Sequence, residues 1–156
     1  MNEKKRTVTH ATFVIERNFP QLPERVYAAF ADPAKKRRWF ADDEEVKTEE
    51  FTTDFRVGGF ERKRFQTKMG LCTNETVYLD IVPNGRIVFA YTMSMHGARF
   101  SSSQSTVEFF AAGKGTDMIY TEQAAFFENA DDAKMRQGGW TYLFGELAKE
   151  LEREFA

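Results

Sequence analysis

The chain has 156 residues, of which 42% are hydrophobic and 29% are charged, and its formal net charge is −2. This length suits one domain with a continuous core, and the composition is typical of a globular protein. The small net charge gives no reason to expect nucleic acid or an anionic membrane as a partner. No apolar run approaches the roughly 20 residues of a membrane helix. The single cysteine, Cys72, excludes an internal disulfide, and together with a polar N-terminus it predicts a cytoplasmic location.

The N-terminal part predicts a flexible leader over residues 1–10, followed by one domain over residues 11–156. Residues 12–19 place Phe13, Ile15 and Phe19 on one face at alternate positions, which indicates a strand although both faces are mixed. Pro23 and Asp32 are both suited to a helix start, Pro23 through its fixed φ and Asp32 as an N-cap before Pro33. Two short helices in tandem are therefore expected, over residues 24–31 and 34–40.

Several strand-like segments separated by turn signals make up the middle of the chain. The acidic stretch 42–50 lacks periodicity and predicts a loop with at most a short edge strand. Asn84-Gly85 is the strongest turn signal, because this dipeptide supplies the positive φ angles of a tight hairpin. Strands joined by tight turns predict an antiparallel meander. The expected strands are residues 51–57, 60–67, 73–82, 86–95, 102–111 and 116–126.

The C-terminal segment 131–155 predicts one long amphipathic helix, because its apolar residues recur at intervals of three and four. Its three glycines would each cost roughly 1 kcal/mol relative to alanine. We therefore expect Gly138, Gly139 and Gly145 to allow close approach, either to the sheet or to a ligand lying between helix and sheet. The order of elements predicts an α+β fold in which a curved antiparallel sheet wraps around the last helix.

An ordered set of motifs covers nearly the whole chain from Phe13 to Phe155. These motifs are LPERVYAAFADPAKKRRWF (22–40), GGF (58–60), YLDIVPNGRIVFAYTM (78–93), TVEF (106–109), GKGT (113–116), YTEQ (120–123) and GW (139–140). In this order they resemble SRPBCC (START-like) domains, and in particular the family related to the C-terminal domain of the activator of heat-shock protein 90 ATPase. The resemblance implies the helix-grip fold of the major birch-pollen allergen, with a cavity between sheet and helix. It implies no single activity, since this superfamily includes lipid carriers, hormone receptors, cyclases and co-chaperones.

The 16 Phe, 2 Trp and 5 Tyr residues allow two interpretations. They fill a packed core, or they line a cavity of the usual kind, mostly apolar with a few polar groups. In the second case the cavity is expected between strand residues 78–93 on one wall and the last helix on the other. The candidate ligand-binding residues are Trp39, Phe40, Phe60, Tyr78, Phe89, Tyr91, Met93, Phe109, Tyr120, Glu122, Trp140 and Phe144.

The charged candidates also have two interpretations each. Glu122 either faces inward beside Tyr120, where it would orient or protonate a ligand, or forms an exposed salt bridge. Arg64 and Arg99 are either anchors for a ligand carboxylate or surface charges. His10 and His96 have no partners at metal-ligand spacing, so neither a metal site nor another cofactor is predicted.

Three functions remain open from the sequence. The first is binding of a small hydrophobic or aromatic molecule, lipid-like or polyketide-like, which the residues favour. The second is a co-chaperone role with heat-shock protein 90 in the stress response. The third is a cyclase or hydratase activity that uses Glu122 or a tyrosine, although no catalytic set is evident. An exposed edge strand is able to pair with the same strand of a second copy, so both a monomer and a homodimer are compatible with the sequence.

Overall fold

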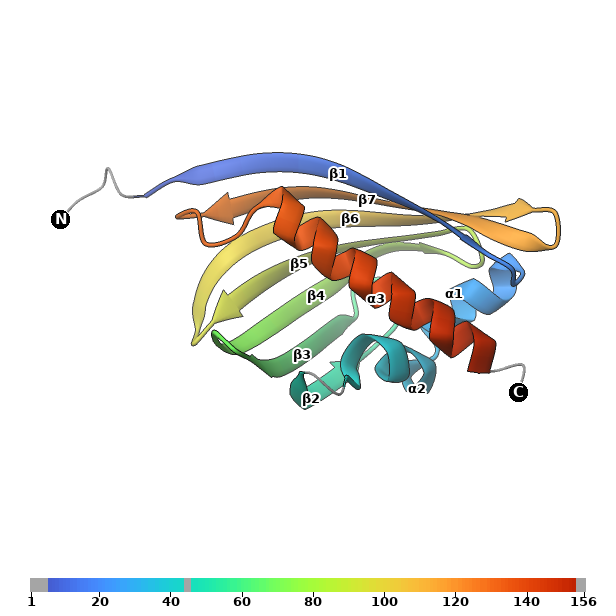
Figure 1. The fold of residues 1–156 in the computed structure, drawn as a ribbon, viewed down its shortest axis with the longest axis horizontal. Helices are drawn as coiled ribbons and strands as arrows, with labels where there is room; N and C mark the ends of the chain where they lie inside the picture. The colour runs from blue at the N-terminus through green and yellow to red at the C-terminus, as the bar shows by residue number, and fades with distance from the viewer. Residues whose placement is uncertain (1–5, 44–45, 154–156) are drawn as a thin grey trace.

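The computed structural model describes residues 6–43 and 46–153. Within these residues one antiparallel sheet has the strand order β1-β7-β6-β5-β4-β3-β2, and the long helix α3 lies across it (Figure 1). The elements are β1 (Val8–Phe19), α1 (Pro23–Ala31), α2 (Pro33–Lys36), the π-helical turn η2 (Arg37–Ala41), β2 (Lys47–Thr53), β3 (Phe60–Thr67), β4 (Gly70–Val82), β5 (Arg86–Met95), β6 (Ala98–Ala112), β7 (Gly115–Phe127) and α3 (Ala133–Arg153).

This is the α+β helix-grip fold that the sequence predicts, with one correction at its N-terminal end. β1 already includes Val8 to His10, and the backbone N–H of Glu128 donates to the carbonyl of Thr7, so the leader predicted over 1–10 is too long. Its residues 1–5 lie outside the described part of the chain. At the other end α3 runs from Ala133 to Arg153, and residues 154–156, where the predicted helix ends, lie outside the described part of the chain.

The two short helices form where prolines and a cap favour them. Pro23 occupies the first turn of α1, and the Asp32 carboxylate accepts from the N–H of Ala34 at the start of α2. The predicted helix over 34–40 becomes π-helical in its second half, where the N–H of Asp42 bonds the carbonyl of Arg37. This wider turn leaves Trp39 and Phe40 buried against the core.

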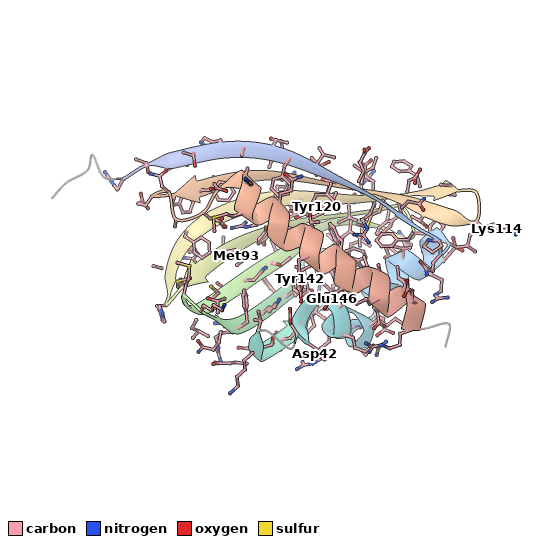
Figure 2. All side chains as sticks on the ribbon, viewed as in Figure 1. Asp42, Met93, Lys114, Tyr120, Tyr142 and Glu146 are labelled. Carbon is pink, nitrogen blue, oxygen red and sulfur yellow. The ribbon has the colours of Figure 1, made fainter. Side chains whose placement is uncertain are left out.

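The second strand lies further toward the N-terminus than the sequence suggests. β2 pairs with β3 through residues 47–53, whereas Asp54 to Gly59 form a turn, so the strand predicted over 51–57 is misplaced. A Cβ at Gly59 would lie 2.0 Å from the carbonyl oxygen of Asp54, which explains the glycine. The hairpin predicted at Asn84-Gly85 is present, with Asn84 at a φ of 63°. Lys114 marks the tip of the β6–β7 hairpin (Figure 2).

Helix α3 covers the inner face of the sheet with one apolar stripe. Trp140, Phe144, Leu147 and Leu151 are buried at intervals of three and four residues. The expectation that its glycines allow close contact with the sheet is wrong. A Cβ at any of the three would meet no atom within 4 Å apart from the helix's own backbone and chain neighbours, so these positions face open space.

Candidate functional site

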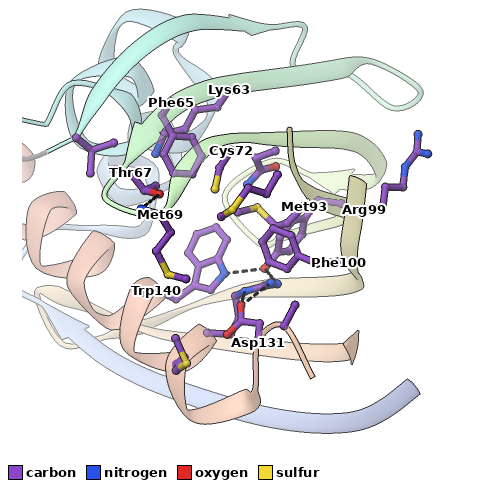
Figure 3. A pocket seen from close by; sticks show the side chains of 18 of the residues that line it. Lys63, Phe65, Thr67, Met69, Cys72, Met93, Arg99, Phe100, Asp131 and Trp140 are labelled. Carbon is purple, nitrogen blue, oxygen red and sulfur yellow. Dashed lines mark hydrogen bonds and ion pairs between the residues drawn. The ribbon is translucent and has the colours of Figure 1, made fainter. Parts of the chain in front are cut away.

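An open cavity of about 880 Å³ lies between the sheet and the N-terminal half of α3. Figure 3 shows Phe65, Met69, Cys72, Met93 and Phe100 around this space, with Trp140 of α3 opposite the strands. The volume falls within the range of small-molecule sites, and aromatic rings and methionines provide much of the wall. The open cavity is thus distinct from the packed half of the core.

Four of the predicted ligand-binding residues line this cavity, namely Phe40, Tyr91, Met93 and Trp140. Phe60 does not belong to it, because this first residue of β3 points outward and is 72% exposed. The remaining seven are buried in the core outside the cavity wall: Trp39, Tyr78, Phe89, Phe109, Tyr120, Glu122 and Phe144. The cavity is consequently displaced from the predicted position toward β3 and the beginning of α3.

Trp140 forms the boundary between packed core and cavity. Its ring centroid lies 4.8 Å from that of Tyr120 and 5.5 Å from that of Phe144 on the core side. It also stacks on Phe40, 6.0 Å away. These contacts fill the space in which the sequence placed the cavity, because the aromatic side chains of sheet and helix meet there.

Glu122 faces inward and is 0% exposed, so the exposed salt bridge considered for it is wrong. The alternation of β7 places it on the same face as Tyr120. Its carboxylate accepts hydrogen bonds from Tyr91 (2.8 and 2.9 Å), from Tyr120 (2.6 Å) and from Nη1 of Arg136 (3.3 Å). Glu122 is thus a buried anchor behind the cavity wall, and its partners Tyr91 and Arg136 are the residues that reach the cavity.

Arg136 is the residue that completes this network, and the sequence reasoning missed it. Its guanidinium donates to Tyr91 Oη (2.9 Å), to Ser101 Oγ (2.7 Å) and to Asp131 (3.0 Å). Tyr91 Oη also accepts from the indole N–H of Trp140 at 3.0 Å. The spacing from Arg136 to Trp140 is one helical turn, so the apolar stripe of α3 already indicates that Arg136 faces inward.

Burial keeps the tyrosines of this network protonated. It raises the pKa of Tyr91, and it raises the pKa of Tyr120 well above its ordinary value of 10.0. Both hydroxyls therefore remain hydrogen-bond donors to Glu122 at neutral pH.

A second buried polar cluster joins α2 to strands β3 and β4. Lys36 Nζ donates to both carboxylate oxygens of Glu61 (2.8 and 2.9 Å) and to Tyr78 Oη (3.1 Å), and Tyr78 donates to Glu61 (2.6 Å). Burial lowers the pKa of Lys36, but Glu61 and Tyr78 outweigh it and raise the value to about 12. Tyr78 is accordingly part of an internal ion-pair cluster.

Lys63 is a cation at the cavity wall that the sequence reasoning did not single out. Its side chain alternates to the inner face of β3 together with Glu61. By contrast Arg64 pairs with Glu50 at the surface (3.2 Å), and Arg99 lies exposed at the cavity rim. Cys72 also lines the cavity, and burial raises the pKa of its thiol.

Within the described residues no group of three His, Cys, Asp or Glu side chains is arranged to hold a metal ion. None of the helices in residues 6–43 and 46–153 is long and apolar enough to cross a membrane.

A curved antiparallel sheet that holds a C-terminal helix over an open cavity defines the helix-grip class of the SRPBCC superfamily. The family model described as "Activator of Hsp90 ATPase homolog 1-like protein" matches residues 21–152, and the chain belongs to this family. The family predicted from the motifs is therefore confirmed.

Solved structures agree with this assignment. Protein Mll3558 from Rhizobium loti is 46% identical, with a TM-score of 0.85 over 92% of this chain and 99% of that one. A protein from Rhizobium leguminosarum is 40% identical, with a TM-score of 0.90 over 95% and 98% of the two chains. An AHSA1-like protein from Aeromonas hydrophila, 20% identical with a TM-score of 0.70 over 92% and 94%, shares the fold. No curated protein matches the chain.

Proposed function

We propose that this protein binds a small, largely apolar molecule between the sheet and α3. The observation that supports this most is the open cavity of about 880 Å³ with aromatic and methionine walls. A protein of this size has enough apolar side chains to fill its core, and the half around Phe144 is filled. A space that stays open beside it, with hydrogen-bonded Tyr91 and Arg136 at its wall, suits a ligand.

Glycines of α3 provide a direct test. Gly139 lines the cavity, whereas its neighbour Gly138 does not, and neither would bring a Cβ into contact with other atoms. Gly139→Leu should obstruct the cavity, and Gly138→Leu is the matched control. Both replacements should stabilise the helix to a similar extent, up to about 1 kcal/mol each.

The measurement is thermal stabilisation and tryptophan fluorescence with fatty acids, aromatic acids and polyketide-like phenols. We expect at least one class to stabilise the protein and to change the emission of Trp140. Gly139→Leu should reduce that binding about tenfold or more, and Gly138→Leu should leave it unchanged. Absence of any stabilising compound across these classes would contradict the proposal.

A second candidate function comes from the family description, which names activation of the Hsp90 ATPase. The test is the ATPase rate of the host's own heat-shock protein 90 with and without this chain. An increase in that rate would support the candidate, whereas an unchanged rate together with no complex would end it.

A further inference from the structure

Lys63 stands out among the charged side chains around the cavity. It is 8% exposed, it lines the cavity, and its Nζ donates to the carbonyl oxygen of Phe40 at 2.6 Å. The ammonium also lies over the rings of Phe40 (4.5 Å) and Phe65 (4.6 Å). An ammonium has three donors, and in residues 6–43 and 46–153 this carbonyl is the single acceptor hydrogen-bonded to it.

The comparison with Arg136 shows why Lys63 is the group suited to a ligand. Arg136 is buried to the same degree, but carboxylates and hydroxyls of Asp131, Glu122, Ser101 and Tyr91 already occupy its donors. A ligand would have to break that network to reach the guanidinium. Lys63 instead has donor capacity left in a cavity with apolar walls, where an oxygen anion would be held strongly.

The charges that act on Lys63 come from α2, from β3 and from the segment after η2. The pKa of Lys63 is lowered to about 8, and burial is the largest cause. Lys36 of α2 also lowers this pKa, whereas Asp43 after η2 and Glu61 of β3 act to raise it. Glu61 is already committed to Lys36 and Tyr78. Elsewhere around the cavity Asp131 is paired with Arg136, while Lys68, Arg99 and Glu128 are exposed residues that also line its wall. The ammonium is therefore held in an environment that an added anion would improve.

We propose that the ligand is an apolar carboxylic acid, whose carboxylate binds the ammonium of Lys63 and whose apolar body extends along Met93 toward Trp140. This deepens the proposed function and rests on it. Phe65 and Phe40 would flank the head of the ligand, and the methionines would adapt to its body.

The test compares dansyl-labelled undecanoic acid with its methyl ester, which has the same apolar body and no charge. We expect the wild-type protein to bind the acid about tenfold or more tightly than the ester, as a buried charge-assisted hydrogen bond provides. Lys63→Met should remove this preference, because it should weaken binding of the acid and leave the affinity for the ester unchanged. The same replacement at exposed Lys68, which also lines the cavity, is the matched control and should preserve the preference.

Ester binding shows that the cavity of Lys63→Met is intact. If that variant does not fold, Lys63→Gln retains a donor for the Phe40 carbonyl without a charge and should give the same loss of preference. Acid affinity should also fall as the pH rises above about 8, where the ammonium loses its proton, while ester affinity stays constant.

The outcomes separate the two proposals. Equal affinity for acid and ester in the wild-type protein overturns the role of Lys63 and leaves the cavity function standing. Loss of acid preference in Lys68→Met, with preference retained in Lys63→Met, overturns the placement of the carboxylate. Binding of neither probe, nor of any compound in the thermal screen, removes the cavity function and this inference with it.

Discussion

At the scale of single residues, Tyr91 connects the core to the cavity. Its hydroxyl accepts from Arg136 and Trp140 and donates to Glu122. Tyr91→Phe should lower the free energy of unfolding by about 2 kcal/mol, because buried donors lose their acceptor. Tyr142→Phe removes a hydroxyl from a residue that is 47% exposed, and it should change stability by less than about 0.5 kcal/mol. Urea unfolding measures both, and equal effects would contradict a role for the network.

Lys63 should also give the protein an unusual dependence of stability on pH. Burial lowers its pKa to about 8, below the ordinary 10.5, so the unfolded chain binds more protons between these values. Stability should therefore rise from about pH 8 toward pH 10, by up to roughly 3 kcal/mol from this group.

Lys36 and Tyr78 act in the opposite direction. Their pKa values are each raised to about 12, from 10.5 and 10.0, so the stability that they contribute is complete below pH 10 and is lost as the pH approaches 12. Urea unfolding across this range should show a rise and then a fall. Lys63→Met should abolish the rise in stability and leave the fall at higher pH. A rise that persists in this variant would show that Lys63 is not its cause.

At the scale of elements, the first turn of α3 positions the cavity wall. The carboxylate of Asp132 accepts from the N–H of Met135 at 2.8 Å, which caps the helix directly before Arg136. Asp132→Ala should lower the free energy of unfolding by about 1 kcal/mol. Asp132→Asn retains the cap and should lower it by only about 0.3 kcal/mol. Thermal unfolding measures the loss. Ligand affinity should weaken with it only in the alanine variant, since Met135 and Arg136 line the cavity.

At the scale of the whole molecule, sheet and helices share one core. Trp39 of η2 and Trp140 of α3 both lie against Phe144, with centroids 6.4 and 5.5 Å away. Tryptophan fluorescence and far-UV circular dichroism should therefore report coincident unfolding transitions. Leu147→Ala should lower the free energy of unfolding by about 3 kcal/mol as measured by either signal, because it creates a cavity in this core. Separate transitions would show that α3 unfolds independently.

The sequence by itself determined the family and the order of elements, because both depend on local signals. Proline and Asp32 start the short helices, Asn84-Gly85 turns a hairpin, and the spacing from Trp140 to Leu151 identifies the apolar stripe of α3. The shift of β2 escaped this reasoning. Its register depends on pairing with β3 across the turn that Gly59 permits.

Only the tertiary structure decided where the cavity lies and which charges face it. The same aromatic residues are able to line a space or fill it. Tyr120 and Phe144 are in ring contact within the packed core, whereas Phe65 and Met93 line the open cavity. The sequence left Glu122 ambiguous and did not single out Lys63, because a charged residue on a strand faces inward only if partners from other elements meet it there. For Glu122 these partners are Tyr91 and Arg136, and for Lys63 the partner is the Phe40 carbonyl.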